Sequence, residues 1–279
     1  MSEADTIHAS GDLPVTREEL VADLRALGVN GERPVLVHSS LSRLGWVCGG
    51  AQAVLEALHQ VLGSQATLVL PAFSGDMSEP SHWQHPPVPE PWWPIIRANM
   101  PAFDPARSPT RMMGAIANSF RGWPGVERSN HPHDSFCACG PKTARILHPH
   151  PLTDGFGEES PLARLYEEDA RILLLGVTHS NNTSLHLSEH RAEWSGKRRA
   201  TSGAAIMKKG ERVWQEFEFL YSDDADFARI GEAFGDRQAR GKVGRGEALW
   251  MSQREIVDFG AAWMTEHRPD SLKSPTVAG

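Results

Sequence analysis

The order of hydrophobic and polar positions in the first third of the chain predicts alternating helices and strands. Residues 16–30 and 51–63 repeat apolar side chains at the spacing of an amphipathic helix, and each run closes at a glycine. Residues 34–40 and 67–73 are short apolar runs typical of buried strands. A strand, a helix and a second strand in this order predict a βαβ unit, whose parallel sheet has to be covered by helices on both faces.

The rest of the chain contains one strong strand signal among several helical ones. Residues 169–177 are almost continuously apolar, which is typical of a central strand. Residues 211–221 alternate in polarity as an exposed antiparallel strand does. Ligands of such sheets bind beyond the carboxyl ends of the strands, so the segments that follow the strands are candidate sites. Other periodic segments predict helices at residues 112–122, 142–150, 160–168 and 252–267.

Three stretches lack this periodicity. We expect residues 1–15 to be a flexible N-terminus and residues 268–279 to be a polar tail. Residues 74–111 are rich in proline and tryptophan, whereas a disordered linker is poor in aromatic residues. A loop this long inside a compact domain is usually functional or disordered, and its tryptophans favour a role in a pocket wall. A surface loop held by its own aromatic side chains fits the pattern equally well.

The composition narrows the class of protein. Hydrophobic residues make up 40% and charged residues 23% of the chain, and no apolar stretch is long enough to cross a bilayer, so we expect a cytoplasmic protein without a membrane partner. The acidic N-terminus lacks the pattern of a signal peptide. A net charge of −7 argues against a nucleic-acid partner and leaves room for a cationic one. Cys48, Cys137 and Cys139 have the spacing of neither a disulfide framework nor a zinc pair, and we expect them to pack as small apolar side chains.

Candidate chemistry gathers directly behind the central strand, in the segment GVTHSNNTSLHLSEH at residues 176–190. His186, Glu189 and His190 form an H-x-x-E-H pattern, in which two histidines one helical turn apart could bind zinc and the glutamate could activate a bound water. The segment also suits acid–base catalysis of acyl transfer, since a histidine oriented by a carboxylate takes a proton near neutral pH. A structural role is the third possibility: His179 and His186 would then be hydrogen-bonded histidines near a capped helix start.

Several ordered motifs resemble one known family. They are VLVHSSLSRLGWVCGGAQAVLEAL, LVLPAFS, SPTRMMGAIANSFRGWPGVERSNHPHDSFCACG, SPLARL and ILLLGVTHSNNTSLHLSEH, followed by GKVGRGEALWMSQREIVDFG. In this order they resemble the aminoglycoside 3-N-acetyltransferases, also called antibiotic N-acetyltransferases, from about residue 16 to residue 264. The resemblance implies one domain over residues 1–279, folded as a three-layer α/β sandwich whose mixed central sheet is covered by helices on both faces.

The resemblance also implies a reaction, in which acetyl-CoA acetylates the 3-amino group of a cationic aminoglycoside without a metal and so confers antibiotic resistance. Under it, we expect His179 to take the proton of the acceptor ammonium, and His186 and Glu189 to orient and tune the site. Serine hydroxyls, glycine backbone and the start of the following helix would hold coenzyme A. The residues expected to contact coenzyme A are His38, Ser39, Ser40, Leu41, Gly49, Gly50, Thr110, Arg111, Met112 and Thr183.

The acceptor is expected to bind along the long loop. Asp76 and Glu79 would pair with ammonium groups of a polycation, and Trp92 would form part of the pocket wall. The acceptor is either an aminoglycoside antibiotic or another amine used by the same family. A zinc hydrolase built on the H-x-x-E-H pattern is one alternative, and a protein that binds coenzyme A or a polycation without catalysis is another. The sequence leaves a monomer and a homodimer equally open.

Overall fold

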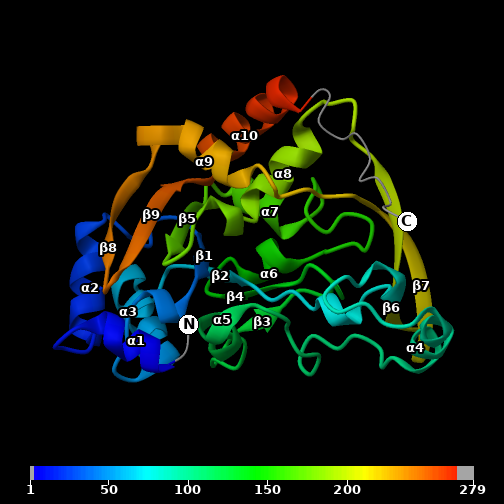
Figure 1. Ribbon diagram of the computed structural model, residues 1–279, viewed down its shortest axis with the longest axis horizontal. Coiled ribbons are helices and arrows are strands. Elements are labelled where there is room, and N and C mark those ends of the chain that lie inside the picture. The colour runs from blue at the N-terminus through cyan, green and yellow to red at the C-terminus, as the bar shows by residue number, and fades with distance from the viewer. Residues whose placement is uncertain (1–2, 269–279) are drawn as a thin grey trace.

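In the computed structural model, which describes residues 3–268, the chain folds around a seven-stranded sheet (Figure 1). The strand order is β3-β4-β2-β1-β5-β9-β8, in which β1 runs parallel to its neighbours β2 and β5 and the other pairs are antiparallel. The sheet is therefore mixed. Its strands are β1 (Val35–Ser39), β2 (Leu68–Pro71), β3 (Glu127–Arg128), β4 (Phe136–Cys139), β5 (Arg171–Leu175), β8 (Ala239–Val243) and β9 (Gly246–Ser252).

Helices cover both faces of this sheet and form a three-layer α/β sandwich. Val35 and Val37 of β1 belong to the core beneath one helical layer, and Leu36 between them belongs to the core beneath the other. The first layer contains α2 (Arg17–Ala26), α3 (Gly50–Leu62) and α5 (Gly114–Arg121). The second contains α6 (Thr143–Leu147), α7 (Pro161–Glu167), α8 (Ser184–Arg191), α9 (Phe227–Phe234) and α10 (Gln253–His267). The predicted fold class is confirmed.

Local sequence signals account for the start of two helices. Thr16 precedes α2, and its hydroxyl accepts a hydrogen bond from the N–H of Glu19 at 3.2 Å. Ser160 precedes α7 and accepts from the N–H of Leu162 at 3.1 Å, while Pro161 occupies the first helical position. Within residues 3–268, no helix is long and apolar enough to cross a membrane.

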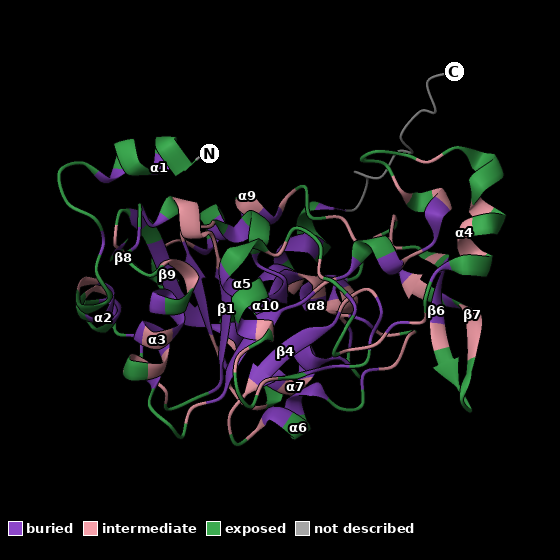
Figure 2. Ribbon diagram, turned by 90° about the horizontal axis from the view of Figure 1, so that it is seen from below, coloured by how far each residue is buried: buried purple, intermediate pink, exposed green. Residues whose placement is uncertain are grey.

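A separate two-stranded ribbon extends from one end of the sandwich (Figure 1), and much of its surface is exposed or half-buried (Figure 2). Its strands, β6 (Arg199–Lys208) and β7 (Glu211–Leu220), pair over their full length across a turn at Lys209 and Gly210, which both have positive φ. The ribbon packs against parts of the segment 74–111. The alternating polarity of the chain predicts β7. It does not predict β6, because the small residues of that strand have little β propensity.

The irregular segments differ from their prediction. Within the predicted flexible N-terminus, residues 3–10 form helix α1, and the hydroxyl of Ser10 at its end accepts a hydrogen bond from the N–H of Trp46 at 2.6 Å. Of the predicted polar tail, Arg268 is buried in the fold, and residues 269–279 lie outside the described residues. The long loop contains four short helices: η2 (Gly75–Met77), η3 (Pro80–His82), η4 (Glu90–Trp92) and α4 (Trp93–Asn99).

Candidate active site

The strands β1 and β5 end side by side at the point from which the sheet grows in both directions. From β1 the chain passes through α3 to β2 on one side, whereas β5 pairs with the other side of β1. The N–H of Ser40, just after β1, donates to the carbonyl of Leu175, the last residue of β5, at 2.9 Å. The loops that leave these strands diverge from this shared edge, and the crevice between such loops is where open α/β sheets bind ligands.

A large open cavity of about 1190 Å³ lies along this edge. Its walls come from the loop after β1, the start of α3, the loop after β5 and the turn between β8 and β9. Helix α1 closes one side through Glu3 and Thr6. Of the residues that the sequence predicts to contact coenzyme A, this cavity contains Ser39, Ser40, Leu41, Gly49, Gly50 and Met112.

The polar groups of the large cavity suit a ligand that carries phosphates. Gly49 and Gly50 have φ angles of +82° and +57°, so the backbone turns into α3 with no side chain between the cavity and the N–H groups of the first helical turn. Arg43 is exposed on this wall and has no ion pair among residues 3–268. Arg245 adds a second cation, which is partly neutralised by Glu19. Anionic groups would be stabilised here.

A smaller cavity of about 200 Å³, here called the inner cavity, continues from the large one. Both cavities are lined by Ser39, Met112, Met113, Val177 and Asn181, so they adjoin. The polar or aromatic residues that line only the inner cavity include His38, Thr183, His186, Asp224 and Phe227. The inner cavity therefore brings the start of α8, two imidazoles and a carboxylate next to the large cavity.

His186 belongs to a chain of hydrogen bonds that runs from the inner cavity into the core. Its Nδ1 lies 2.6 Å from Oε2 of Glu189, which is fully buried. Oε1 of Glu189 accepts hydrogen bonds from Arg268 and from the N–H of Asp223, both at 2.8 Å. Burial alone would raise the pKa of Glu189, but these hydrogen bonds outweigh burial and lower it. Glu189 is thus an anion, so Nδ1 of His186 donates to it, and Nε2 is the ring nitrogen that this bond leaves for a ligand.

Two aromatic rings pack on the imidazole of His186. Phe156 stacks on it, with ring centroids 4.7 Å apart and planes at 15°, and the ring of Phe227 lies 4.9 Å away. The side chain of His186 is 16% exposed. Packing and the bond to Glu189 together fix the orientation of the ring, which is what a positioned proton acceptor requires.

His38 brings the second imidazole to the inner cavity but has a different chemistry. It is buried, and its Nε2 has no hydrogen-bond partner among residues 3–268. Burial, and to a smaller extent His186, lowers the pKa of His38 to about 3. His38 is therefore neutral at pH 7 and offers hydrogen bonding rather than proton uptake. Of the two imidazoles in this cavity, His186 is the one suited to act as a base.

The structure places His179, the base predicted from the sequence, outside both cavities. Its ring packs under α9 so closely that a Cβ atom at Gly231 would meet it at 2.2 Å. Nε2 lies 2.8 Å from Oε1 of Gln238, and Nδ1 lies 3.3 Å from Nδ2 of Asn182. Burial lowers the pKa of His179. Because amides engage both ring nitrogens, this geometry gives His179 a structural role and no access to the inner cavity.

Five other residues predicted to bind ligands line neither cavity. The hydroxyl of Thr110 bonds to a neighbouring asparagine of α5. Arg111 pairs with Asp76, and Glu79 forms a bidentate ion pair with an arginine of α4. Trp92, at the end of η4 in the segment 74–111, is 55% exposed. Because the acidic side chains already have cationic partners within the chain, they are poorly placed to receive a cationic substrate.

Several residues of the site were not predicted. Arg43 lies in the motif that begins with VLVHSS, in the loop directly after a buried strand. That position could have identified it as a ligand-binding residue. Asp224 and Phe227 follow the ribbon strand β7, and Arg268 follows α10. No local pattern connects these segments to β5, so only the folded chain brings them to His186.

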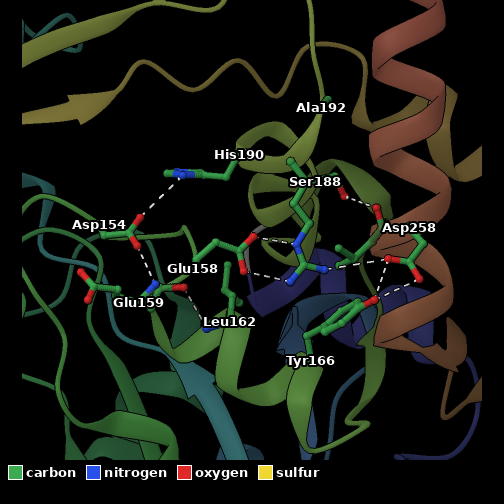
Figure 3. A network of polar contacts seen from close by, with 12 residues as sticks. Asp154, Glu158, Glu159, Leu162, Tyr166, Ser188, His190, Ala192 and Asp258 are labelled. Atoms are coloured by element: carbon green, nitrogen blue, oxygen red, sulfur yellow. Dashed lines mark hydrogen bonds and ion pairs between the residues drawn. The ribbon is translucent and has the colours of Figure 1, made fainter.

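The residues of the H-x-x-E-H pattern do not converge on one point. His186 bonds to Glu189, whereas Nδ1 of His190 lies 3.6 Å from Oδ1 of Asp154, toward which the ring of His190 points (Figure 3). Within residues 3–268, no group of three or more histidine, cysteine, aspartate or glutamate side chains is arranged to hold a metal ion.

The chain is similar over most of its length to aminoglycoside acetyltransferases. A family model described as aminoglycoside 3-N-acetyltransferase matches residues 36–265. The chain is 42% identical over 267 residues to the SPbeta prophage-derived aminoglycoside N(3')-acetyltransferase-like protein YokD of Bacillus subtilis, with 95% of this chain and 97% of that protein covered. It is 36% identical over 271 residues to aminoglycoside N(3)-acetyltransferase VII of Streptomyces paromomycinus, with 91% and 93% covered.

Solved structures agree with these relatives. The crystal structure of YokD from Bacillus subtilis matches with a TM-score of 0.91 and 41% identity over 95% of this chain and 98% of that one. AAC-IIIb in a binary complex with CoASH matches with a TM-score of 0.81 and 29% identity, covering 91% and 97%. AAC-VIa bound to sisomicin matches with a TM-score of 0.82 and 30% identity, covering 93% and 100%.

Proposed function

The chain belongs to the aminoglycoside 3-N-acetyltransferase family, and on that premise we propose that it transfers the acetyl group of acetyl-CoA to the 3-amino group of an aminoglycoside, with His186 as the general base. One observation carries the proposal: a large cavity suited to phosphates adjoins a small one that is lined by an imidazole held by a buried carboxylate. A cytoplasmic location, where acetyl-CoA is available, belongs to the same proposal.

Coenzyme A is proposed to lie in the large cavity. Arg43, Arg245 and the first turn of α3 would bind its phosphates, and the serine hydroxyls after β1 would bind the amides of its pantetheine arm. The acetyl thioester would then lie beside the residues that line both cavities. The similarity to a structure that contains CoASH supports this placement of the donor.

The acceptor amine is proposed to meet the thioester beside His186. An aminoglycoside ammonium is not nucleophilic until it loses a proton, and Nε2 of His186 is the lone pair available to take it. The free amine attacks the thioester carbon, so the C–N bond forms and the C–S bond breaks. The second proton that the nitrogen loses passes to the thiolate of coenzyme A, and the imidazolium gives up the first one to solvent. Glu189 stabilises the imidazolium formed on the way. Thr183, at the start of α8, lies where helix N–H groups favour the developing oxyanion.

The acceptor would occupy the side of the inner cavity that Asp224 and Phe227 form. Asp224 supplies a carboxylate for an ammonium group, and Phe227 supplies an apolar wall for a sugar ring. Similarity to a structure that contains sisomicin supports an aminoglycoside as the acceptor. These residues replace Asp76 and Glu79 as the proposed acceptor contacts.

The test is a thiol-release assay with acetyl-CoA and a panel of aminoglycosides that differ in whether the 3-amino group is free, run with and without a chelator. We expect release that needs the free 3-amino group and ignores the chelator. The His186→Ala variant should lose turnover, and His179→Ala is its matched control because both variants remove one imidazole from neighbouring segments.

The other outcomes separate the alternatives. Loss of turnover with the chelator would favour the zinc hydrolase. Binding of coenzyme A without thiol release from any aminoglycoside would point to a different amine acceptor or to a non-catalytic binder, which a second panel of simple diamines would distinguish. Turnover that survives in His186→Ala but not in His179→Ala would overturn the proposed base.

A further inference from the structure

A third cavity, of about 260 Å³, has no part in the reaction proposed above. It is formed by the loop before β4, the loop before α7, one face of α8 and the end of β7. We call it the Asp134 cavity after its one acidic lining residue. The other lining residues used below are His133, Phe156, His190, Tyr221 and Ser222.

The Asp134 cavity lies next to the inner cavity. Phe156 lines the Asp134 cavity and stacks on His186, which lines the inner one. Its ring also contacts that of Phe73, another inner-cavity residue, with centroids 5.5 Å apart. Ser222 lines the Asp134 cavity, and Asp224 on the same loop lines the inner cavity. The two spaces are thus adjacent, with the ring of Phe156 and the loop from Ser222 to Asp224 between them.

The carboxylate of Asp134 has no hydrogen-bond donor within residues 3–268. The nearest titratable group is His131, whose Nδ1 lies 3.8 Å from Oδ2 of Asp134. That nitrogen already accepts hydrogen bonds from the N–H of His133 at 3.2 Å and of Asp134 itself at 2.9 Å. It therefore presents a lone pair and no proton to the carboxylate. The Asp134 side chain is 27% exposed, so the carboxylate can be reached.

Asp134 is the acidic side chain among the described residues that line this cavity. Among residues 3–268, no lysine or arginine lines it. Burial lowers the pKa of His133 to about 4 and also lowers the pKa of His190, so both rings are neutral near pH 7. Two cations lie close but are engaged elsewhere. Lys197 donates to backbone carbonyls at the end of α8, and the guanidinium of Arg198 lies 4.3 Å from the centre of the Tyr221 ring.

We propose that the Asp134 cavity is a second cation subsite, in which Asp134 binds an ammonium group of the acceptor other than the one that is acetylated. The inference rests on the proposed function, because it takes the reacting amine to lie at His186. A carboxylate that lacks a donor and is held in a desolvated cavity gains most from a ligand that brings both a proton donor and a positive charge. The subsite would select acceptors that carry an amine on a second ring.

The protonation of Asp134 gives the subsite a pH dependence. Burial raises the pKa of Asp134 to about 7, and His186 opposes this shift. Below pH 7 the carboxyl of the free enzyme therefore takes up a proton and loses its attraction for an ammonium group. His133 and His190 line the same cavity and His131 lies beside Asp134, and burial lowers the pKa of all three rings. The KM of a suitable acceptor should rise as the pH falls through 7.

The experiment compares acceptors that differ in a single amine. Neomycin and paromomycin differ by one amine and one hydroxyl at the same position, as do kanamycin B and kanamycin A. KM and kcat are measured at about pH 8 and about pH 6 for the wild type, for Asp134→Asn and for the control Asp236→Asn, which removes the same charge from an exposed position outside the three cavities. The carboxamide keeps the shape of the side chain, and a thermal melt checks that each variant is folded.

In at least one pair, Asp134→Asn should raise the KM of the amine-bearing acceptor by roughly 10–100-fold and that of its hydroxyl partner by much less, as expected for the loss of a charged hydrogen bond. The rise in KM between about pH 8 and about pH 6 should disappear in this variant. Equal effects on both members of each pair, or the same change in Asp236→Asn, would overturn the subsite. The proposed function would still stand in that case, because it depends on turnover by the wild type.

Discussion

Two neighbouring segments after β5, η5 (His179–Asn181) and α8, each present a histidine with a polar partner, yet only one of these histidines is part of a cavity. In η5 the ring of His179 is held between two amides and packs against the glycine of α9. In α8 the ring of His186 is held by a carboxylate and lines the inner cavity. An amide partner fixes a neutral ring, whereas an ionised carboxylate makes its ring a better proton acceptor. The partner, and not the histidine, distinguishes the two segments.

The largest expected effect concerns the histidine of α8. His186→Ala should lower kcat by about 10²–10⁴-fold, the usual contribution of a general base. Affinity for coenzyme A should stay within a few-fold, since the large cavity is unchanged. Steady-state kinetics and calorimetric titration with coenzyme A measure the two effects. A loss of coenzyme A affinity as large as the loss of kcat would show that the variant disturbs the whole site and would leave the contrast with η5 unsupported.

The next largest effect is on stability and concerns Arg268, whose guanidinium pairs with Glu189. Arg268→Met should lower the free energy of unfolding by about 3–5 kcal/mol, because it leaves a fully buried carboxylate without its guanidinium partner. Urea unfolding measures it. Arg107→Met is the matched control: Arg107 is 88% exposed in an ion pair with Asp104, so its removal should cost less than about 1 kcal/mol. Similar losses in both variants would contradict the role of Arg268 as the internal partner of Glu189.

A smaller effect is expected from the histidine of η5. His179→Ala should leave kcat within about twofold of the wild type but lower the free energy of unfolding by about 1–3 kcal/mol, because Gln238 loses its partner in a buried site. Burial lowers the pKa of His179, so the unfolded chain binds a proton there more readily. This residue's contribution to stability is therefore lost as the pH falls below about 6.5. The stability of His179→Ala should fall less steeply with acid than that of the wild type, and an equally steep fall would argue against the assignment.

The smallest effect separates two aspartates. Asp76→Asn should change the KM for the acceptor by less than about twofold, since Asp76 is half-exposed and paired with Arg111 outside the cavities. Asp224→Asn should raise the same KM by about 5–10-fold with little change in the KM of acetyl-CoA. If the two variants exchange these results, the acceptor binds along the segment 74–111 after all.

Sequence reasoning predicted much of the fold correctly. The apolar runs of β1, β2 and β5 and the periodic helices α2, α3 and α10 are strong local signals, because strands buried on both faces and amphipathic helices each require a distinct pattern. The strands β8 and β9 were missed. Four of the five residues of β8 are exposed or half-buried, as suits a strand at the edge of the sheet, so it shows no continuous apolar run.

The part of the candidate site that the sequence predicts also depends on strong local patterns. Ser39, Ser40 and the glycines that precede α3 directly follow a strong strand, so their place at the edge of the sheet follows from the βαβ pattern. The pairing of His186 with Glu189 needs only their separation on one helix. The roles of His179, Asp76 and Glu79 were expected from the family resemblance and the residue types. In the folded chain Gln238, Arg111 and Arg97 pair with them, and all three lie more than fifteen residues away in the sequence.

The sequence by itself therefore determined the elements with strong periodicity, the edge of the sheet at which a ligand binds, and the histidine and glutamate of α8. These follow from interactions within a few residues or from burial patterns that repeat along the chain. Only the tertiary structure decided which histidine reaches a cavity, that Arg268 holds Glu189, and that Asp134 and Asp224 lie near His186. Access to a cavity and desolvation of a charge depend on segments far apart in the chain, so no local pattern encodes them.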